Sequence, residues 1–157
     1  MQLPYSEEVN IGYLSRLFVN TTNCYKFFWF QAILSKLDGT QSRFTFDELI
    51  NEMIADAWYM VTEYCLRLGP LGITDNLEEV VKYIHENYGF MSSEKREKIL
   101  EFLQTTEDKK IIKYKMDLTL NVPYRLQVPF YDEIAIERSM WNGSKQILTD
   151  EINRQRR

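Results

Sequence analysis

The sequence is poor in the residues that build metal centres and disulfide frameworks. Its 157 residues include only two cysteines and one histidine. Cys24 and Cys65 lie far apart in apolar surroundings, which excludes a zinc knuckle and predicts two buried free thiols in a reducing compartment. The single histidine, His85, excludes any mechanism in this chain that needs two imidazoles. Its place on the flank of a predicted amphipathic helix favours a structural or surface role over that of a general base.

Nucleotide-binding loops and targeting segments are also missing. There is no Walker loop and no GxGxxG motif, so we expect no cofactor. The N-terminus, MQLPYSEEVN, is polar and acidic and does not resemble a cleavable signal. The longest apolar run is interrupted by Lys26 and followed by Gln31, so it falls short of the roughly 20 residues that a membrane span requires. These absences predict a cytoplasmic protein with no membrane partner.

Aromatic residues are abundant, at 14% of the chain, and they gather in NTTNCYKFFWFQAIL at residues 20–34. Such rings could stack on bases or fill a core. Base stacking requires cations beside the rings, and the basic clusters KKIIKYK (109–115) and RQRR lie elsewhere. We therefore predict a central, surrounded helix, capped by one of residues 20–23, with four buried positions: Phe28, Trp29, Ala32 and Ile33.

Apolar residues repeat at three- and four-residue spacing along most of the chain, which predicts helices. A short helix is expected at residues 10–18. A capping box, Thr45 to Glu48, starts a long helix that continues to Leu68 and stops at Gly69-Pro70. Residues 75–78 repeat this pattern for a helix that Gly89 closes. Ser92 or Ser93 is expected to cap the next helix, whose apolar side carries Ile99, Leu100 and Leu103.

Residues 111–122 fit two patterns. Apolar and polar residues alternate as in a strand, yet Ile112, Met116 and Leu120 also stack on one face of a helix. Because no partner strand is evident, helix is favoured. The predicted fold is all-α, a single domain (1–157) of about six or seven helices. It comprises a helical core (1–120) and a C-terminal part (121–157) with a proline-containing loop near 121–130 and a helical extension.

The net charge of −4 is unevenly distributed, with 6 basic against 12 acidic residues up to position 91 and 13 against 11 beyond it. Candidate nucleic-acid contacts are the basic residues Lys109, Lys110, Lys113, Lys115 and Arg125. A solvated helix face explains the lysines equally simply, and Arg125 could instead organise loop carbonyls through buried hydrogen bonds. The acidic row Asp47, Glu48, Glu52 and Asp56 is interpreted as a solvated face rather than a metal site, so a stand-alone metal-dependent enzyme is disfavoured.

Three segments together resemble the N-terminal helical region of bacterial HNH endonuclease-domain proteins. They are LSRLFVNTTNCYKFFWFQAIL (14–34), FDELINEMIADAWYMV (46–61) and NVPYRLQVPF (121–130). An HNH site uses histidine as metal ligand and general base, and in this family the cassette comes near the C-terminus. The chain has one histidine outside that region and no CxxC pair, so no catalytic residue can be assigned from the resemblance.

The resemblance implies a non-catalytic helical module of an HNH-endonuclease-like protein that assists DNA binding or positioning. The segment DEINRQRR at residues 150–157 is expected to run on into more protein, so the catalytic part would be missing or encoded separately. An alternative is a protein–protein interaction module with no nucleic-acid role. Possible partners are therefore DNA, the missing nuclease portion or a second copy of the chain.

Overall fold

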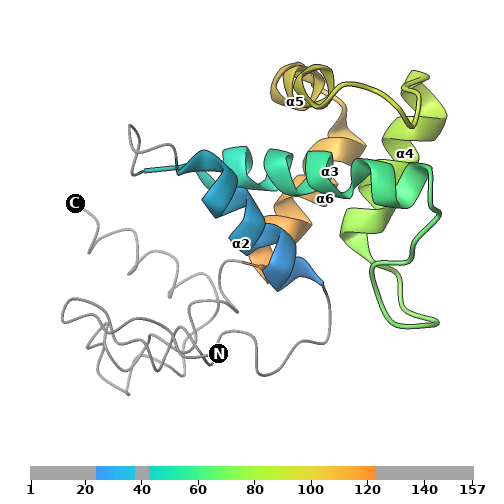
Figure 1. The fold of residues 1–157 in the computed structure, drawn as a ribbon, viewed down its shortest axis with the longest axis horizontal. Coiled ribbons are helices and arrows are strands. Elements are labelled where there is room, and N and C mark those ends of the chain that lie inside the picture. Colours follow the sequence, from blue (N-terminus) through green and yellow to red (C-terminus); the bar gives the residue numbers. More distant parts are fainter. Residues whose placement is uncertain (1–23, 38–42, 123–157) are drawn as a thin grey trace.

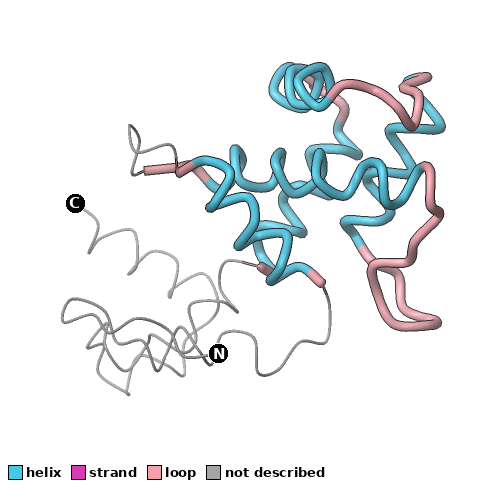
Figure 2. Tube along the Cα trace, in the orientation of Figure 1, coloured by secondary structure: helices cyan, strands magenta, loops and turns pink. Residues whose placement is uncertain are grey.

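The computed structural model describes residues 24–37 and 43–122, and the remaining residues lie outside this description. The described part is built from α-helices joined by loops and contains no strand, which confirms the predicted all-α class (Figures 1 and 2). It holds five helices: α2 (Tyr25–Lys36), α3 (Phe46–Thr62), α4 (Asn76–Tyr88), α5 (Arg96–Thr105) and α6 (Lys109–Asn121). The predicted helix at 10–18, Arg125, the proline-containing loop and the C-terminal extension lie outside the described residues.

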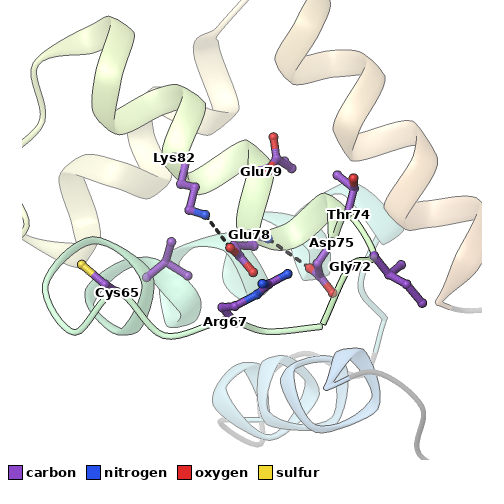
Figure 3. Close-up of a pocket in the computed structure, with 10 residues that line it drawn as sticks. Cys65, Arg67, Gly72, Thr74, Asp75, Glu78, Glu79 and Lys82 are labelled. Carbon is purple, nitrogen blue, oxygen red and sulfur yellow. Dashed lines mark hydrogen bonds and ion pairs between the residues drawn. The ribbon is translucent and has the colours of Figure 1, made fainter. Parts of the chain in front are cut away.

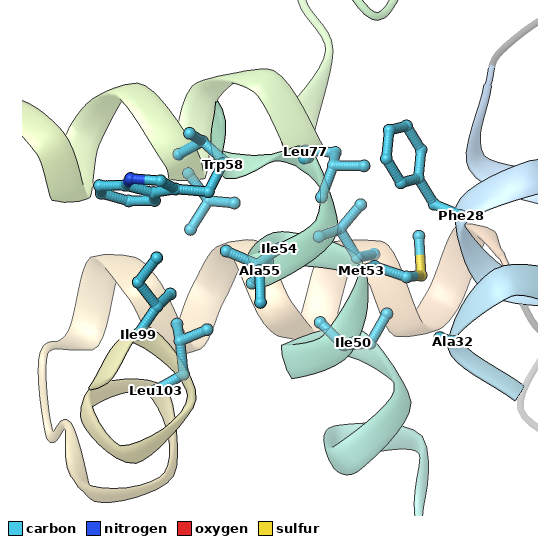
Figure 4. Close-up of a cluster of buried hydrophobic side chains, with 14 of the residues drawn as sticks. Phe28, Ala32, Ile50, Met53, Ile54, Ala55, Trp58, Leu77, Ile99 and Leu103 are labelled. Atoms are coloured by element: carbon cyan, nitrogen blue, oxygen red, sulfur yellow. The ribbon is translucent and has the colours of Figure 1, made fainter. Parts of the chain in front are cut away.

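Helix α3 is the centre of the packing, because α2, α4, α5 and α6 all contact it. Figure 4 shows side chains from α2, α4 and α5 converging on it. Ten of its residues are buried, among them Met53, Ile54 and Trp58. The largest fully buried side chains of the other helices include Leu77, Ile84, Ile99, Leu103, Ile111 and Leu118. Burying each such side chain stabilises the fold by roughly 1.5–3 kcal/mol.

Helix α2 occupies a different position from the one predicted. Phe28, Trp29 and Ala32 are buried as expected and Ile33 is half-buried. However, Phe27, Leu34 and Leu37 are each more than half exposed, so the prediction of a surrounded helix is wrong for that face. A helix that is apolar all round was expected to be central. Among the described helices, α2 instead packs chiefly against α3.

Helix α3 begins as predicted and ends earlier. The Thr45 side chain accepts a hydrogen bond from the Glu48 amide, and the Glu48 carboxylate accepts one from the Thr45 amide, which confirms the capping box. The predicted end at Leu68 is wrong, because the helix ends at Thr62 and Cys65 is left-handed at φ 52°. The helix closes through a local turn, in which the Leu66 amide donates to the Met60 carbonyl (3.0 Å). Farther along the loop, the Leu68 amide donates to Glu78 of α4 (3.1 Å).

The predicted caps of the next two helices differ in their outcome. Asp75 caps α4 through bonds from the Leu77 and Glu78 amides, and Gly89 closes it in the left-handed conformation at φ 68°. The expected cap of α5 at Ser92 or Ser93 is wrong: the helix begins after Lys95, whose side chain makes no capping bond. The favoured helical interpretation of residues 111–122 is confirmed by α6.

Candidate functional site

Helix α6 carries four of the five predicted nucleic-acid contacts, and Asp108 fixes where it starts. One Asp108 oxygen, Oδ1, accepts hydrogen bonds from the amides of Lys110 (2.7 Å) and Ile111 (3.2 Å). The other, Oδ2, accepts the hydroxyl protons of Tyr83 (3.1 Å) and Tyr88 (2.5 Å). The bond from Tyr88 is the largest of the causes that hold the pKa of Asp108 below its usual value. Asp108 therefore joins the N-terminus of α6 to α4.

The structure does not bring the predicted basic residues together on one surface. Lys115 is only 12% exposed, forms an ion pair with Asp47 of α3 (2.7 Å) and donates to the Leu103 carbonyl (3.2 Å). The Lys110 ammonium lies 4.1 Å from the centre of the Tyr83 ring, a cation–π contact. Lys109 and Lys113 are exposed, and within the described part of the chain neither forms an ion pair. Arg125 lies outside the described residues.

A row of apolar side chains runs along the exposed face of α6. Ile112 is 41% exposed, Met116 60% and Leu120 43%. The opposite face contributes Ile111 and Leu118 to the core. We call the three exposed residues the α6 ridge. Because their spacing is four residues, they form one continuous line on the helix surface. The sequence pattern contained this spacing, but it could not tell the exposed line from the buried one.

The acidic row on α3 is only partly solvated, so its interpretation from sequence is wrong for two residues. Glu52 is buried, and the Asp56 side chain is almost completely buried. Both carboxylates pair with the Arg96 guanidinium at the start of α5, and Lys36 of α2 adds an ion pair to Glu52 (3.4 Å). Burial raises the pKa of Asp56, and Arg96 opposes that shift. These charges join three helices and form no open metal site.

The other two members of the row lie at its start. Asp47 is largely exposed and pairs with Lys115, while Glu48 completes the Thr45 capping box. No group of three or more His, Cys, Asp or Glu side chains is placed to hold a metal ion among the described residues. The acidic row therefore contributes helix capping and ion pairing in the part of the chain that the structure describes.

A polar pocket of about 420 Å³ lies between the end of α3, the following loop and the start of α4 (Figure 3). Its charged residues are of both signs, with Arg67 and Lys82 beside three carboxylates. The Glu78 carboxylate already binds Lys82 (2.5 Å) and the Leu68 amide (3.1 Å). One oxygen of Asp75, Oδ1, is occupied in capping α4. The pocket thus presents neither a concentrated charge nor a nucleophile paired with a base.

His85 and the cysteines have no catalytic arrangement. The His85 Nδ1 lies 2.7 Å from the Phe90 carbonyl oxygen, and its ring packs edge-on against Trp58. This contact agrees with the structural role expected for the histidine. Both cysteines are free, as predicted, and burial raises the pKa of the Cys24 thiol to about 12. The prediction that both are buried is wrong, since Cys24 is half-buried and Cys65 is exposed.

Comparisons with known proteins supply no assignment. No family model, no curated protein and no solved structure matches this chain. Among the described helices, none combines the length and the apolarity that a bilayer span requires.

Proposed function

We propose that the chain is a non-catalytic helical module of an HNH-endonuclease-like protein and that it acts by binding another polypeptide along the α6 ridge. The observation that carries this proposal is the row of Ile112, Met116 and Leu120, exposed on a helix whose opposite face is locked into the core. Aligned apolar side chains in water are typical of surfaces that bind protein. Other charged residues singled out in the sequence are already engaged, because Lys115, Glu52 and Asp56 form ion pairs within the fold.

The HNH assignment rests on the three sequence segments quoted above. The described part of the first segment ends in α2, and the second segment lies in α3; their buried aromatic residues form part of the core: Phe28, Trp29 and Trp58. The free thiols of Cys24 and Cys65 accord with a reducing compartment, and on that ground we propose a cytoplasmic location. The proposed module has a structural and binding role, and the chemistry would belong to a nuclease cassette outside it.

A second candidate function, DNA positioning, is favoured by one observation. Lys109 and Lys113 are both exposed and lie one turn apart on α6. Two cations on one helical face can contact neighbouring phosphates. Against this, the α6 ridge lies directly beside them, and apolar side chains gain nothing from a phosphate backbone.

Mobility-shift titration of the full chain with a short DNA duplex at low salt separates the two functions. Polypeptide binding through the ridge predicts no shifted band. DNA positioning predicts a band that fades as salt rises. The band should be weaker in the Lys109→Glu/Lys113→Glu variant, because each lost phosphate contact lowers the affinity and also reduces its salt dependence. Such a band would overturn the polypeptide proposal in favour of the nucleic-acid one.

A further inference from the structure

The α6 ridge has the geometry of a helix-docking surface. Ile112, Met116 and Leu120 are separated by four residues each, which is the spacing of the ridges that interdigitate when two helices pack. The commonest packing of this kind crosses the helices at about 50°. The helix below the ridge is anchored at its start by Asp108 and along its inner face by Ile111 and Leu118. A partner helix would therefore meet a surface that is already in place.

The charges beside the ridge are positive over its N-terminal half. Lys109 lies three residues before Ile112, and Lys113 lies three residues before Met116, so both cations border the same side of the ridge. The neighbouring lysines do not contribute, because Lys110 contacts Tyr83 and Lys115 pairs with Asp47. One turn beyond Lys113 comes Asp117, which is half-buried and ends the positive row.

From this arrangement we infer that the α6 ridge binds an amphipathic helix of another polypeptide that carries carboxylates beside its apolar row. This inference rests on the proposed function and adds the chemistry of the partner. The apolar row of that helix packs between Ile112, Met116 and Leu120. Its carboxylates lie over Lys109 and Lys113, so that the two rows match in both shape and charge. The positive charge of Lys109 and Lys113 favours binding of an acidic helix over a basic or neutral one.

The inference can be tested with three designed helical peptides that share a leucine row of four-residue spacing and differ only in the flanking residue: glutamate, glutamine or lysine. Binding to the full chain is measured by fluorescence anisotropy at low salt. We expect the glutamate peptide to bind most tightly and the lysine peptide least. Lys113→Glu should reduce the affinity for the glutamate peptide about five-fold, the upper range for an exposed ion pair, and raise the affinity for the lysine peptide.

A matched charge change elsewhere provides the control. Lys95 is exposed at the start of α5, so Lys95→Glu should leave all three affinities unchanged. Met116→Asp should reduce the affinity for every peptide at least about ten-fold, because it places a charge in the apolar contact. Circular dichroism confirms that each variant is folded.

The outcomes separate the two proposals. Equal binding of the three peptides, with loss in Met116→Asp, would overturn the acidic partner and leave the polypeptide-binding function in place. Absence of saturable binding by any peptide would overturn both. Binding to anionic phosphatidylglycerol vesicles in place of the glutamate peptide would overturn the inference in favour of a membrane surface.

Discussion

At the scale of single residues, the buried charges of this protein connect helices that are distant in sequence. Arg96 lies 40 residues from Asp56 and 44 from Glu52, yet its guanidinium binds both carboxylates. As the first residue of α5, Arg96 sits at the positive end of the helix dipole, where a cation is disfavoured. The two carboxylates of α3 offset that cost and orient α5 on the central helix.

Removing the guanidinium should therefore destabilise the fold. Arg96→Gln leaves Asp56 and Glu52 buried without their main counterion, which costs 3–5 kcal/mol for a fully buried pair. Because about a third of the Arg96 side chain is exposed, we expect a smaller loss of about 2 kcal/mol in the free energy of unfolding, measured in urea. Arg67→Gln is the control, since Arg67 is exposed and in no ion pair among the described residues. Equal losses in the two variants would contradict the role of Arg96.

Asp108 should make the stability depend on pH. Its folded pKa is lowered, so its contribution is complete above the unfolded pKa and is lost as the pH falls through the folded pKa. Asp108→Asn keeps the capping oxygen, but the amide NH2 that replaces Oδ2 can accept neither tyrosine hydroxyl proton. We expect the urea midpoint of this variant to lie below that of the parent at neutral pH, and the gap to close in acid. A gap that stays the same in acid would contradict this role of Asp108.

At the scale of helices, α6 has one face that holds the fold together and another that remains in solvent. Leu118 is fully buried, whereas Met116, two residues away, is 60% exposed. A strand would place both residues on one face, because side chains alternate along a strand with a period of two. The helix places them on nearly opposite sides, and this is what makes the α6 ridge available.

Two alanine substitutions test this register. Leu118→Ala removes buried methyl groups and leaves a cavity, so we expect a loss of about 2–5 kcal/mol in the free energy of unfolding. Met116→Ala should change it by about 0.5 kcal/mol or less, as is usual for exposed positions. Urea titration of both variants measures the difference. Similar losses at the two positions would mean that the ridge is buried in solution.

The boundaries of α4 and the start of α3 could be predicted from sequence, whereas the end of α3, the start of α5 and the burial of α2 could not. Thr45 with Glu48, and Asp75, cap their helices through bonds to residues within three positions, and Gly89 ends α4 through its own left-handed backbone. The end of α3 lies instead just before Cys65, a residue other than glycine in the left-handed conformation, which periodicity does not contain. The exposure of one face of α2 likewise depends on which helices pack against it.

The candidate site could be predicted from sequence only in part. The sequence identified the lysines of α6 as a group. Which of them contact other residues of the fold depends on tertiary contacts, of Lys110 with Tyr83 and of Lys115 with Asp47. The burial of Glu52 and Asp56 could not be foreseen, because their partner Arg96 is remote in the chain. What the pattern did contain was the four-residue spacing from Ile112 to Leu120, one of the two patterns that residues 111–122 fit.

At the scale of the whole molecule, the described part consists of one central helix, α3, surrounded by four others, and the charged residues of α3 are engaged in capping and ion pairs. In the pocket beside α4, Lys82 and Glu78 already bind one another, and the charges are of both signs. The α6 ridge differs from both, because its apolar side chains face solvent beside two cations that form no ion pair among the described residues. This contrast is the basis for proposing a binding module.

The most direct test of that proposal is to map where a helix binds. Amide chemical shifts of the ¹⁵N-labelled full chain would be recorded by NMR during titration with the glutamate-flanked peptide. Binding at the ridge predicts the largest, saturable shifts at Ile112, Met116 and Leu120, and unchanged shifts around the pocket at Gly72 and Glu79. Shifts centred on the pocket, or none that saturate, would contradict the account.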